Sequence, residues 1–417
     1  MAVPRFTDGP GIDNLLLYLD RMGHPERALK VIHVAGTNGK GSVCAYLEAV
    51  LRRSGYKTGF FCSPHLVTMR ERFRINFAMC TEEQLFKAWE EVRDLMEEAV
   101  ADGLAPLTFF EIMFVMALCI FREEKPDYCI METGLGGRLD ATNVCLPVLC
   151  VITSISLDHT EILGDTLEKI AGEKAGIIKP GVPVVFCDEG SGTARVIREY
   201  ADQFHAPCFS LTEDELIICE KTENKIDFFI NNRYYKSSRI QLNTWAEYQV
   251  FNAGLAALAL RVLFPDLEDS LICEGISSMY WEGRMEQLRP RFFVDGAHNP
   301  GAVRSICRML KKSERSWRLL FAVCSDKSYS EMIRMLADIP FKEIYVTAIS
   351  GCRAARTELV EEEFRRYTDV PLQSFPSVPE AVNRMLQDQE DEEYCLCLGS
   401  LYLVGEIRQM LEEIEEI

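Results

Sequence analysis

Residues 31–42 read VIHVAGTNGKGS, and this stretch decides the fold of the chain. The apolar, β-branched run at 31–35 predicts a buried strand, and the glycines after it let the backbone turn sharply with its N–H groups pointing inward. Beyond Ser42, apolar residues recur at helical spacing, so the turn opens onto a helix N-terminus that favours an anion. Lys40 adds a cation, and the Ser42 hydroxyl is a candidate magnesium ligand. The stretch therefore predicts a loop that cradles phosphate.

This loop is a variant of the common P-loop, which has four residues between its glycines and a Ser or Thr directly after the Lys. Here two residues separate Gly36 from Gly39, and Gly41 stands between Lys40 and Ser42. A glycine-rich turn that binds no ligand is the alternative interpretation. The Lys and the strand-loop-helix context disfavour it.

Length and charge limit the possible functions. The chain has 417 residues, more than a single hydrophobic core usually supports, so two domains are expected. Its 64 acidic and 45 basic residues give a net charge of -19, which argues against a general affinity for nucleic acid or for an anionic membrane. We expect small-molecule substrates, a local basic site for any anionic substrate, and a monomer.

Cysteine usage and hydropathy suggest a compartment. The 16 cysteines are scattered without a CxxC pair, which indicates buried free thiols and a reducing cytoplasm. Residues 1–11 have no charged segment followed by an apolar core, so no signal peptide is expected. The longest apolar stretch, 109–121, contains Glu111 and is too short to span a bilayer. We therefore expect a cytoplasmic protein.

Two further strands are predicted to end in candidate site residues. Residues 56–61 form one strand, and Ser63 and His65 follow it in a loop. Residues 127–131 form another, which ends in Glu132 and the glycine-rich stretch TGLGGRLD. Ligands collect at the carboxyl edge of an open α/β sheet, so Glu132 is suited to bind a metal beside phosphates. A turn role for Ser63 and a capping role for Glu132 are the alternatives.

Short apolar strands alternate with helices along most of the chain, which predicts a mostly parallel, doubly wound sheet. The pattern changes between residues 216 and 242. There we expect a β-hairpin with strands at 227–230 and 233–235 and Asn231-Asn232 as its turn.

A second series of strands and helices begins at Phe292. The segment that contains Pro290 precedes it and is typical of a linker. We therefore predict two domains, residues 1–286 and residues 287–417.

Eight stretches carry a combined signature that extends over both predicted domains: HVAGTNGKGSV (33–43), SPHL (63–66), TFFE (108–111), METGLGGRLDATN (131–143), LDHTEILGDTLEKIAGEKAGIIKPGVPVV (157–185), EGRME (282–286), DGAHNP (295–300) and GSLYLVGE (399–406). Together they closely resemble the folylpolyglutamate synthases and bifunctional dihydrofolate synthases of the Mur ligase superfamily. The resemblance implies a P-loop, Mur-ligase-type central domain with a mostly parallel doubly wound sheet. It also implies a smaller, Rossmann-like α/β C-terminal domain.

The resemblance further implies an ATP-dependent ligase that adds L-glutamate to a folate, to dihydropteroate or to both. ATP would phosphorylate the substrate carboxylate, and the amine of glutamate would attack the acyl phosphate. The chemistry of the residues agrees, because transfer between anions requires cations that offset the charge. Lys40, magnesium and Arg284 can supply them.

By position, the resemblance assigns residues to four ligands: ATP, the pterin, glutamate and magnesium. The ATP contacts would be Asn38, Gly39, Lys40, Gly41, Ser42, Asn252, Arg284 and Asp295. The substrate contacts would be Thr108, Phe109, Phe110, Glu111, Arg138, Leu139 and Asp140 for the pterin, and His298 and Ser400 for glutamate. Two magnesium ions would be held by Ser63, Glu132, His159 and Lys174, and the catalytic residues would be Lys40, Lys174 and His298. For Glu111, compensation of the helix dipole is the alternative.

Lys174 carries the most specific hypothesis. In the family, the matching Lys is N-carboxylated, which turns a cation into an anion able to bind a second magnesium. Carbamate formation needs a neutral amine, so the site must lower the pKa of Lys174 by burial or by nearby cations. An ordinary surface lysine beside Glu173 is the alternative.

Two other functions remain open from the sequence. One is a Mur-type ligase that acts on a cell-wall precursor or a polypeptide, which the TFFE and RLDATN stretches disfavour. The other is a nucleotide-binding regulator without turnover. The presence of Lys40, Glu132, His159 and Lys174 disfavours this second function.

Overall fold

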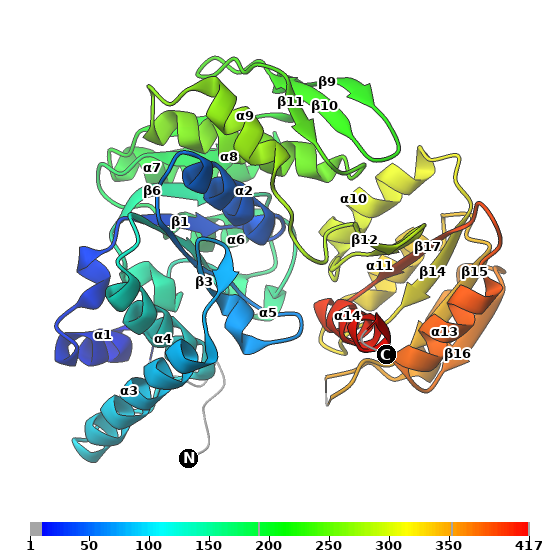
Figure 1. Ribbon diagram of the computed structural model, residues 1–417, viewed down its shortest axis with the longest axis horizontal. Helices are drawn as coiled ribbons and strands as arrows, with labels where there is room; N and C mark the ends of the chain where they lie inside the picture. Colours follow the sequence, from blue (N-terminus) through cyan, green and yellow to red (C-terminus); the bar gives the residue numbers. More distant parts are fainter. Residues whose placement is uncertain (1–10, 191, 352, 416–417) are drawn as a thin grey trace. The chain divides into compact units, whose positions relative to one another are not determined.

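The computed structural model describes residues 11–190, 192–351 and 353–415 (Figure 1). The chain divides into two compact units. The first holds the described residues up to Trp245 together with Gln249–Met279, and the second holds Ala246–Tyr248 and the chain from Tyr280 onward. The domain boundary expected after residue 286 stays a prediction.

The first unit is built on a sheet whose eight described strands have the order β4-β3-β2-β5-β1-β6-β7-β8. Neighbours from β2 to β8 run parallel, and the pairs β2-β3 and β3-β4 are antiparallel. The strands are β1 (Val31–Ala35), β2 (Thr58–Phe61), β3 (Phe73–Ile75), β4 (Ala78–Met79), β5 (Tyr128–Glu132), β6 (Pro147–Ile152), β7 (Val184–Cys187) and β8 (Cys208–Leu211). The predicted mostly parallel sheet is confirmed.

β1 lies inside this sheet, between β5 and β6. A parallel strand that is covered on both faces is expected to be apolar throughout rather than alternating. Accordingly Val31, Ile32 and Val34 are all fully buried. The loop after β1 therefore emerges at the carboxyl edge of the sheet, beside the ends of β5 and β6.

Helices cover both faces of the sheet. On one face, one apolar core joins α1, α3 and α4 to β1, β2 and β5, and a neighbouring core joins α6 and α7 to β6 and β7. On the other face, α2 contacts β1, β2 and β5. Thr81, Thr108 and Thr166 are N-caps, and the side chain of each accepts a hydrogen bond from the backbone N–H three residues later. The helices of the unit are α1 (Ile12–Arg21), α2 (Lys40–Arg53), α3 (Glu82–Ala101), α4 (Phe109–Glu124), α5 (Thr160–Leu163), α6 (Leu167–Ala175), α7 (Gly192–Gln203), α8 (Tyr248–Leu263) and α9 (Asp269–Ser277), with the short 3₁₀ helices η2 (Pro25–Ala28), η3 (Met69–Arg72), η4 (Ala141–Val144) and η5 (Glu213–Glu215).

A small antiparallel sheet has the strand order β11-β10-β9, formed by β9 (Leu216–Lys221), β10 (Ile226–Ile230) and β11 (Ile240–Leu242). The prediction of a second hairpin strand at 233–235 is wrong. Asn232 and Tyr235 instead exchange backbone hydrogen bonds of 3.0 and 3.2 Å, which closes a turn at this place. Tyr235 is buried outside the ladder, and the Asn232 side chain donates to Ser210 O at 2.9 Å. With these contacts the turn lies at residues 232–235, and the next strand of the sheet, β11, begins only at Ile240.

The second unit is a smaller α/β structure with the strand order β12-β13-β17-β14-β15-β16. β12 (Glu286–Arg289) is antiparallel to β13, and the other pairs are parallel. The remaining elements are β13 (Phe292–Val294), β14 (Trp317–Phe321), β15 (Glu343–Thr347), β16 (Leu372–Phe375), β17 (Tyr394–Leu398), α10 (Pro300–Lys311), α11 (Tyr329–Leu336), α12 (Thr357–Arg365), α13 (Val378–Asp388) and α14 (Leu401–Glu415). The expected second, smaller and Rossmann-like α/β fold is confirmed.

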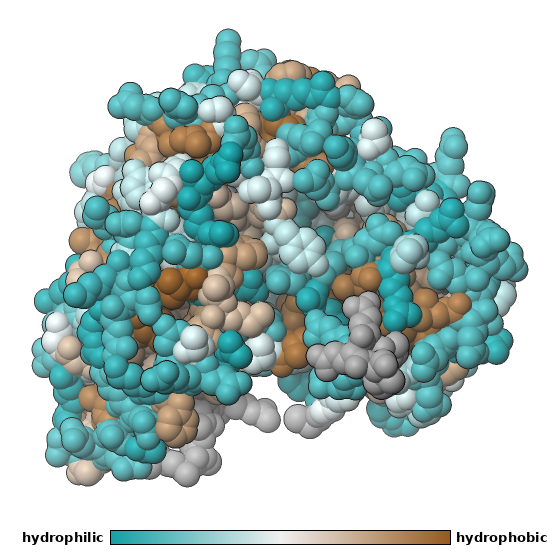
Figure 2. Space-filling view, in the orientation of Figure 1, coloured by the Kyte–Doolittle hydropathy of each residue, from teal (hydrophilic) through white to brown (hydrophobic). Residues whose placement is uncertain are grey.

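The face seen in Figure 2 is mostly polar. Figure 2 shows hydrophilic side chains over most of the visible face, with apolar ones in separate patches. Within the described ranges, no helix has the length and apolarity needed to cross a bilayer. The described cysteines are free thiols and most of them are buried, while Cys352 lies outside the described residues.

Candidate functional site

The predicted phosphate loop connects β1 to α2, which is drawn in blue in Figure 1. α2 begins at Lys40, and Gly39 is its N-cap with φ 87°. A Cβ on Gly39 would lie 2.3 Å from Asn252 Oδ1, so the loop requires glycine for both its conformation and its packing. The structure therefore places Asn252 of α8 directly against the phosphate loop.

The segment after β6, residues 153–156, holds this loop in shape. Thr37 N donates to Ser154 O at 2.8 Å, and Thr153 Oγ1 donates to Asn38 O at 2.7 Å. Asn38 Nδ2 donates to Ser156 Oγ at 3.0 Å. This segment, TSIS, was not a predicted part of the site, because it contains no charged or metal-binding side chain. Its only signal in the sequence was its place directly after the apolar run PVLCVI, residues 147–152.

Two lysines converge on the same loop. Lys40 Nζ donates to Gly36 O at 3.2 Å and to Thr37 O at 3.3 Å, and Lys174 Nζ donates to Gly36 O at 2.7 Å. Lys174 is only 3% exposed. Burial, followed by the charge of Lys40, lowers the pKa of Lys174 to about 7. Lys174 is therefore not a surface lysine, and a large fraction of it is neutral near pH 7.

Ser42 belongs to a short chain of side-chain hydrogen bonds. Gln249 Nε2 donates to Ser42 Oγ at 3.2 Å, and Asn252 Nδ2 donates to Gln249 Oε1 at 3.0 Å. Gln249 was not a predicted site residue. Its spacing from Asn252, three residues along the same helix, was the available signal.

Ser63 and Glu132 lie together at the ends of the adjacent parallel strands β2 and β5. Ser63 N donates to Glu132 Oε2 at 3.3 Å, and Glu132 is buried. A hydroxyl and a carboxylate are hard oxygen donors of the kind that magnesium prefers, and this ion usually keeps few protein ligands. The pair therefore fits a magnesium ion that is also bound to phosphate oxygens.

The other two predicted magnesium ligands are placed differently. His159 is the N-cap of α5, its side chain is 38% exposed, and its Nε2 lies 3.8 Å from Asp158 Oδ1. Lys174 is directed at the Gly36 carbonyl. In the part of the chain that the structure describes, no group of three or more His, Cys, Asp or Glu side chains has a metal-binding arrangement. The metal roles of His159 and Lys174 stay predictions.

The predicted substrate segment 108–111 forms the start of α4. Thr108 N and Oγ1 each donate to Glu111 Oε2 at 2.7 Å, and both residues are buried, as in a capping box. The Phe110 ring packs on Gly134, where an added Cβ would lie 2.5 Å from Phe110 Cζ. Phe109 is 43% exposed and is the member of the segment most open to a ligand.

The second predicted substrate segment, 138–140, is partly turned inward. Asp140 is fully buried, and its Oδ2 accepts from Gly134 N and Leu135 N at 2.9 Å each. Burial raises the pKa of Asp140. Arg138 reaches α6, where one of its terminal nitrogens donates to Gly172 O at 3.0 Å. Leu139, in contrast, is 65% exposed.

In the second unit, Asp295 follows β13 and is buried. Its Oδ2 accepts from Tyr248 Oη at 2.6 Å and from Met285 N at 2.8 Å, and its Oδ1 accepts from Ala297 N at 2.8 Å. Burial raises the pKa of Asp295, and the charge of Arg284 opposes this shift. Asp295 thus ties the loop after β13 to the turn that carries Arg284.

The remaining predicted residues of this unit lie at the same sheet edge. His298 Nδ1 is 2.8 Å from Gly296 O, and a Cβ on Gly296 would lie 2.4 Å from a terminal nitrogen of Arg284. Ser400 follows the neighbouring strand β17 and is buried, and its Oγ accepts from Tyr402 N at 3.1 Å. Arg284, Asp295 and His298 therefore belong to one loop cluster, with Ser400 on the adjacent strand end.

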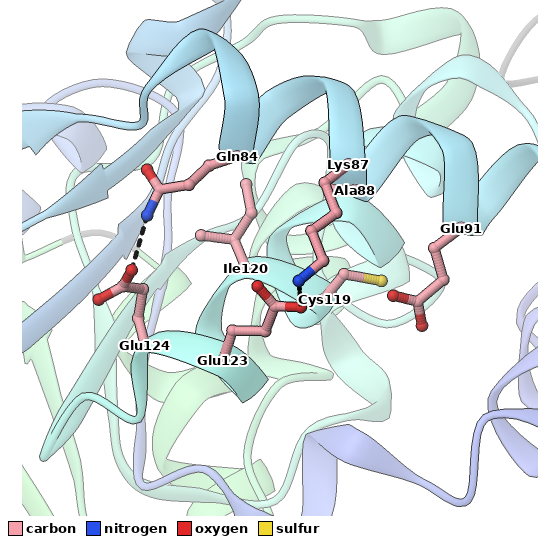
Figure 3. Close-up of a pocket in the computed structure, with 8 residues that line it drawn as sticks. All are labelled: Gln84, Lys87, Ala88, Glu91, Cys119, Ile120, Glu123 and Glu124. Atoms are coloured by element: carbon pink, nitrogen blue, oxygen red, sulfur yellow. Dashed lines mark hydrogen bonds and ion pairs between the residues drawn. The ribbon is translucent and has the colours of Figure 1, made fainter.

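A shallow surface pocket lies between α3 and the last turns of α4 (Figure 3). Its polar groups are used between the two helices: Lys87 Nζ pairs with Glu123 Oε1 at 2.7 Å, and Gln84 Nε2 donates to Glu124 Oε1 at 2.6 Å. It contains none of the predicted site residues. Its lining residues are Gln84, Lys87, Ala88, Glu91, Cys119, Ile120, Glu123 and Glu124.

The chain is similar in sequence to known Mur ligases. The Mur ligase middle domain matches residues 34–260, and the glutamate ligase domain of Mur ligases matches residues 283–401. A dihydrofolate synthase/folylpolyglutamate synthase of Bacillus subtilis is 34% identical, covering 98% of this chain and 96% of the relative. A dihydrofolate synthetase of Saccharomyces cerevisiae is 30% identical, covering 95% of this chain and 96% of the relative.

Solved structures show the same fold. E. coli FolC in complex with DHPP and ADP matches with a TM-score of 0.86 and 29% identity, covering 97% of this chain and 94% of that one. Mycobacterium tuberculosis folylpolyglutamate synthase complexed with ADP matches with a TM-score of 0.88 and 25% identity, covering 96% and 94%. The chain therefore belongs to the folylpolyglutamate synthase and dihydrofolate synthase family of Mur ligases.

Proposed function

We propose that this chain is an ATP-dependent ligase that joins L-glutamate to the carboxylate of a folate, of dihydropteroate or of both, through an acyl phosphate. One observation carries the proposal: Lys40 and Lys174 both reach the phosphate loop that starts at Gly36. The family membership and the ADP-bound relatives support ATP as the phosphate donor.

The triphosphate would bind at residues 36–42, where backbone N–H groups and the start of α2 favour an anion. Lys40 would exchange its two neutral carbonyl acceptors for phosphate oxygens, because charge-assisted hydrogen bonds are stronger. Ser63 and Glu132 would hold magnesium, which offsets negative charge on the phosphates when it is bound. These contacts stabilise the charge that develops as the terminal phosphoryl group moves to the substrate carboxylate.

Lys174 is the proposed site of N-carboxylation. Its neutral amine would attack carbon dioxide, an N–C bond would form, and the displaced proton would pass to water. The product is an anion that can serve a second magnesium together with His159. The lowered pKa of Lys174 makes this reaction accessible near neutral pH.

In the same proposal, Thr108–Glu111 and Arg138–Asp140 border the pterin, with Phe109 and Leu139 as the exposed members. Arg284 and Asp295 serve the nucleotide, and His298 and Ser400 serve glutamate. Residues 1–286 would form the central domain and residues 287–417 the C-terminal domain. The enzyme would act as a cytoplasmic monomer.

The decisive assay measures ADP release with dihydropteroate and with tetrahydrofolate separately, each with and without glutamate. Glutamate-dependent ADP formation with at least one acid is expected, together with its loss in Lys40→Ala. Saturable ATP binding without ADP formation would instead favour a nucleotide-binding regulator. Undiminished turnover in Lys40→Ala would refute the proposed role of the loop.

A further inference from the structure

The loop at 62–68, which carries Ser63, is held from inside by one carboxylate. Glu71 Oε2 accepts from Leu66 N at 2.7 Å, and Glu71 Oε1 accepts from Val67 N at 2.8 Å and from Thr68 N at 2.7 Å. Glu71 is 8% exposed and belongs to η3, which follows the loop directly. Three consecutive N–H groups, which no strand ladder satisfies, thus depend on a single side chain.

The start of the loop is fixed at the carboxyl edge of the sheet. Cys62 N donates to Arg72 O at 3.2 Å, and Cys62 Sγ lies 3.3 Å from Glu71 O. Ser63 N donates to Glu132 Oε2 at 3.3 Å. Ser63 therefore lies between two anchors, with Glu132 at one end of the loop and Glu71 at the other.

The residue after Glu71 holds the middle of the loop. Arg72 Nε donates to His65 Nδ1 at 2.9 Å, and the guanidinium carbon of Arg72 lies 5.5 Å from the centroid of the Phe109 ring. Phe109 is the exposed member of the predicted substrate segment. Glu71 and Arg72 thus connect the loop that carries Ser63 to the start of α4.

We propose that Glu71 is a positioning residue for the ligase reaction, because its carboxylate fixes the loop that presents Ser63 beside Glu132. This inference rests on the proposed function of the chain. An ionised carboxylate only accepts hydrogen bonds and can serve all three N–H groups, whereas a Gln side chain would turn an NH₂ donor toward at least one of them. Misplacement by about 1 Å at a reacting site can cost roughly 100-fold in rate, so a loosened loop should be visible in turnover.

The chain offers a matched control. Glu215 closes the same kind of capping box at the 3₁₀ helix η5, where its Oε2 accepts from Thr212 N at 2.9 Å and from Asn232 Nδ2 at 2.7 Å. Glu71→Gln and Glu215→Gln make the same chemical change in the same motif. An effect that merely reflects a weakened capping box should therefore appear in both variants.

The experiment uses the full chain and two readouts. Hydrogen exchange measures the amides of Leu66, Val67 and Thr68, and ADP release measures turnover and the magnesium concentration that gives half-maximal activity. For Glu71→Gln we expect amide exchange faster by at least about tenfold, turnover lower by about 10- to 100-fold, and a higher magnesium requirement. Glu215→Gln should leave all three unchanged.

Each other outcome has a defined meaning. Fast exchange with unchanged kinetics would overturn the positioning role, and unchanged exchange would overturn the anchoring itself. If the unmodified chain releases no ADP with any acid, the proposed function fails, while the exchange data still show whether Glu71 anchors the loop. Should Glu71→Gln not fold by circular dichroism, Glu71→Asp is measured in its place, since it keeps the charge but shortens the reach.

Discussion

Replacing Gly36 by alanine should destabilise the first unit and weaken ATP binding. Gly36 has φ 150°, and an added Cβ would lie 1.8 Å from Thr153 Oγ1, 2.9 Å from Thr153 Cβ and 3.1 Å from the Thr153 backbone nitrogen. Rotation of the Thr153 side chain would relieve the first of these contacts but not the other two. The same rotation would break the bond from Thr153 Oγ1 to Asn38 O, which shapes the loop.

The magnitude follows from three contributions. A backbone conformation that disfavours L-residues costs about 1–2 kcal/mol, and overpacking of a tight site costs about 1–3 kcal/mol. Loss of the hydrogen bond to Asn38 adds about 1 kcal/mol. Gly55 provides the control, because it has φ 86° in the same unit and no atom within 4 Å of an added Cβ. Gly36→Ala should therefore lose about 2–4 kcal/mol more than Gly55→Ala, which carries the backbone cost alone.

Two measurements test this expectation. Urea unfolding gives the difference in stability between the two variants, and titration calorimetry gives their affinity for ATP. Gly36→Ala should bind ATP at least about tenfold more weakly, while Gly55→Ala should bind it normally, since every 1.4 kcal/mol is a factor of ten. Equal stability of the two variants would refute the packing argument. Normal ATP affinity in a destabilised Gly36→Ala would refute the assignment of this loop to phosphate.

Three further predictions follow from named contacts. Because the pKa of Lys174 is about 7, its ammonium form predominates at lower pH and cannot form a carbamate; activity at limiting bicarbonate should therefore rise as pH increases from 6 to 8, and a flat profile would contradict the carboxylation hypothesis. Glu132→Gln should raise the magnesium concentration needed for half-maximal ADP release by about tenfold or more, and an unchanged requirement would remove Glu132 from the metal site. In the second unit, Arg318 is buried and donates to Glu393 at 2.8 Å and to Glu343 at 2.6 Å. Arg318→Met should therefore cost about 3–5 kcal/mol in urea unfolding, because each charge-assisted hydrogen bond contributes about 1.5–3 kcal/mol, and a loss below about 1 kcal/mol would show that the network relaxes. Burial raises the pKa of Glu393, but hydrogen bonds from Lys342, from the Glu390 backbone and from Arg318 lower it to about 2. The stability that these bonds give the folded chain should therefore be lost as pH falls from about 4.5 toward 2.

The elements that the sequence predicts well are those specified by neighbouring residues. The mostly apolar run of β1 and the glycines after it required no distant partner. The phosphate loop, in contrast, is held by a hydrogen bond from Thr37 Oγ1 to Ser156 O. These residues are 119 positions apart, and no local sequence pattern predicts that they meet. The displaced turn at Asn232 has the same origin, because its side chain bonds to Ser210 on another strand.

The predicted site residues divide in the same way. Residue types that chemistry requires, such as Lys40 and Glu132, could be named from their place at strand ends. The contact of Gln249 with Ser42 could not, because the two residues are 207 positions apart and only the folded chain brings them together. For Glu71 a local signal was present, since Thr68 three residues before it completes a capping-box pattern.

Lys40 and Lys174 both donate to the Gly36 carbonyl, but their side chains differ in how freely they can move. This difference suits each lysine to a different chemical role. Lys40 bonds to neutral carbonyls and lies at the open start of α2, so phosphate oxygens can draw it away at little cost. Lys174 is enclosed and cannot follow without leaving an unsatisfied carbonyl in its place. Its charge, in contrast, is easily lost, because burial and the neighbouring Lys40 both favour the neutral amine. A mobile cation is what a phosphate that binds and leaves requires, and a fixed amine of lowered pKa is what carbamate formation requires.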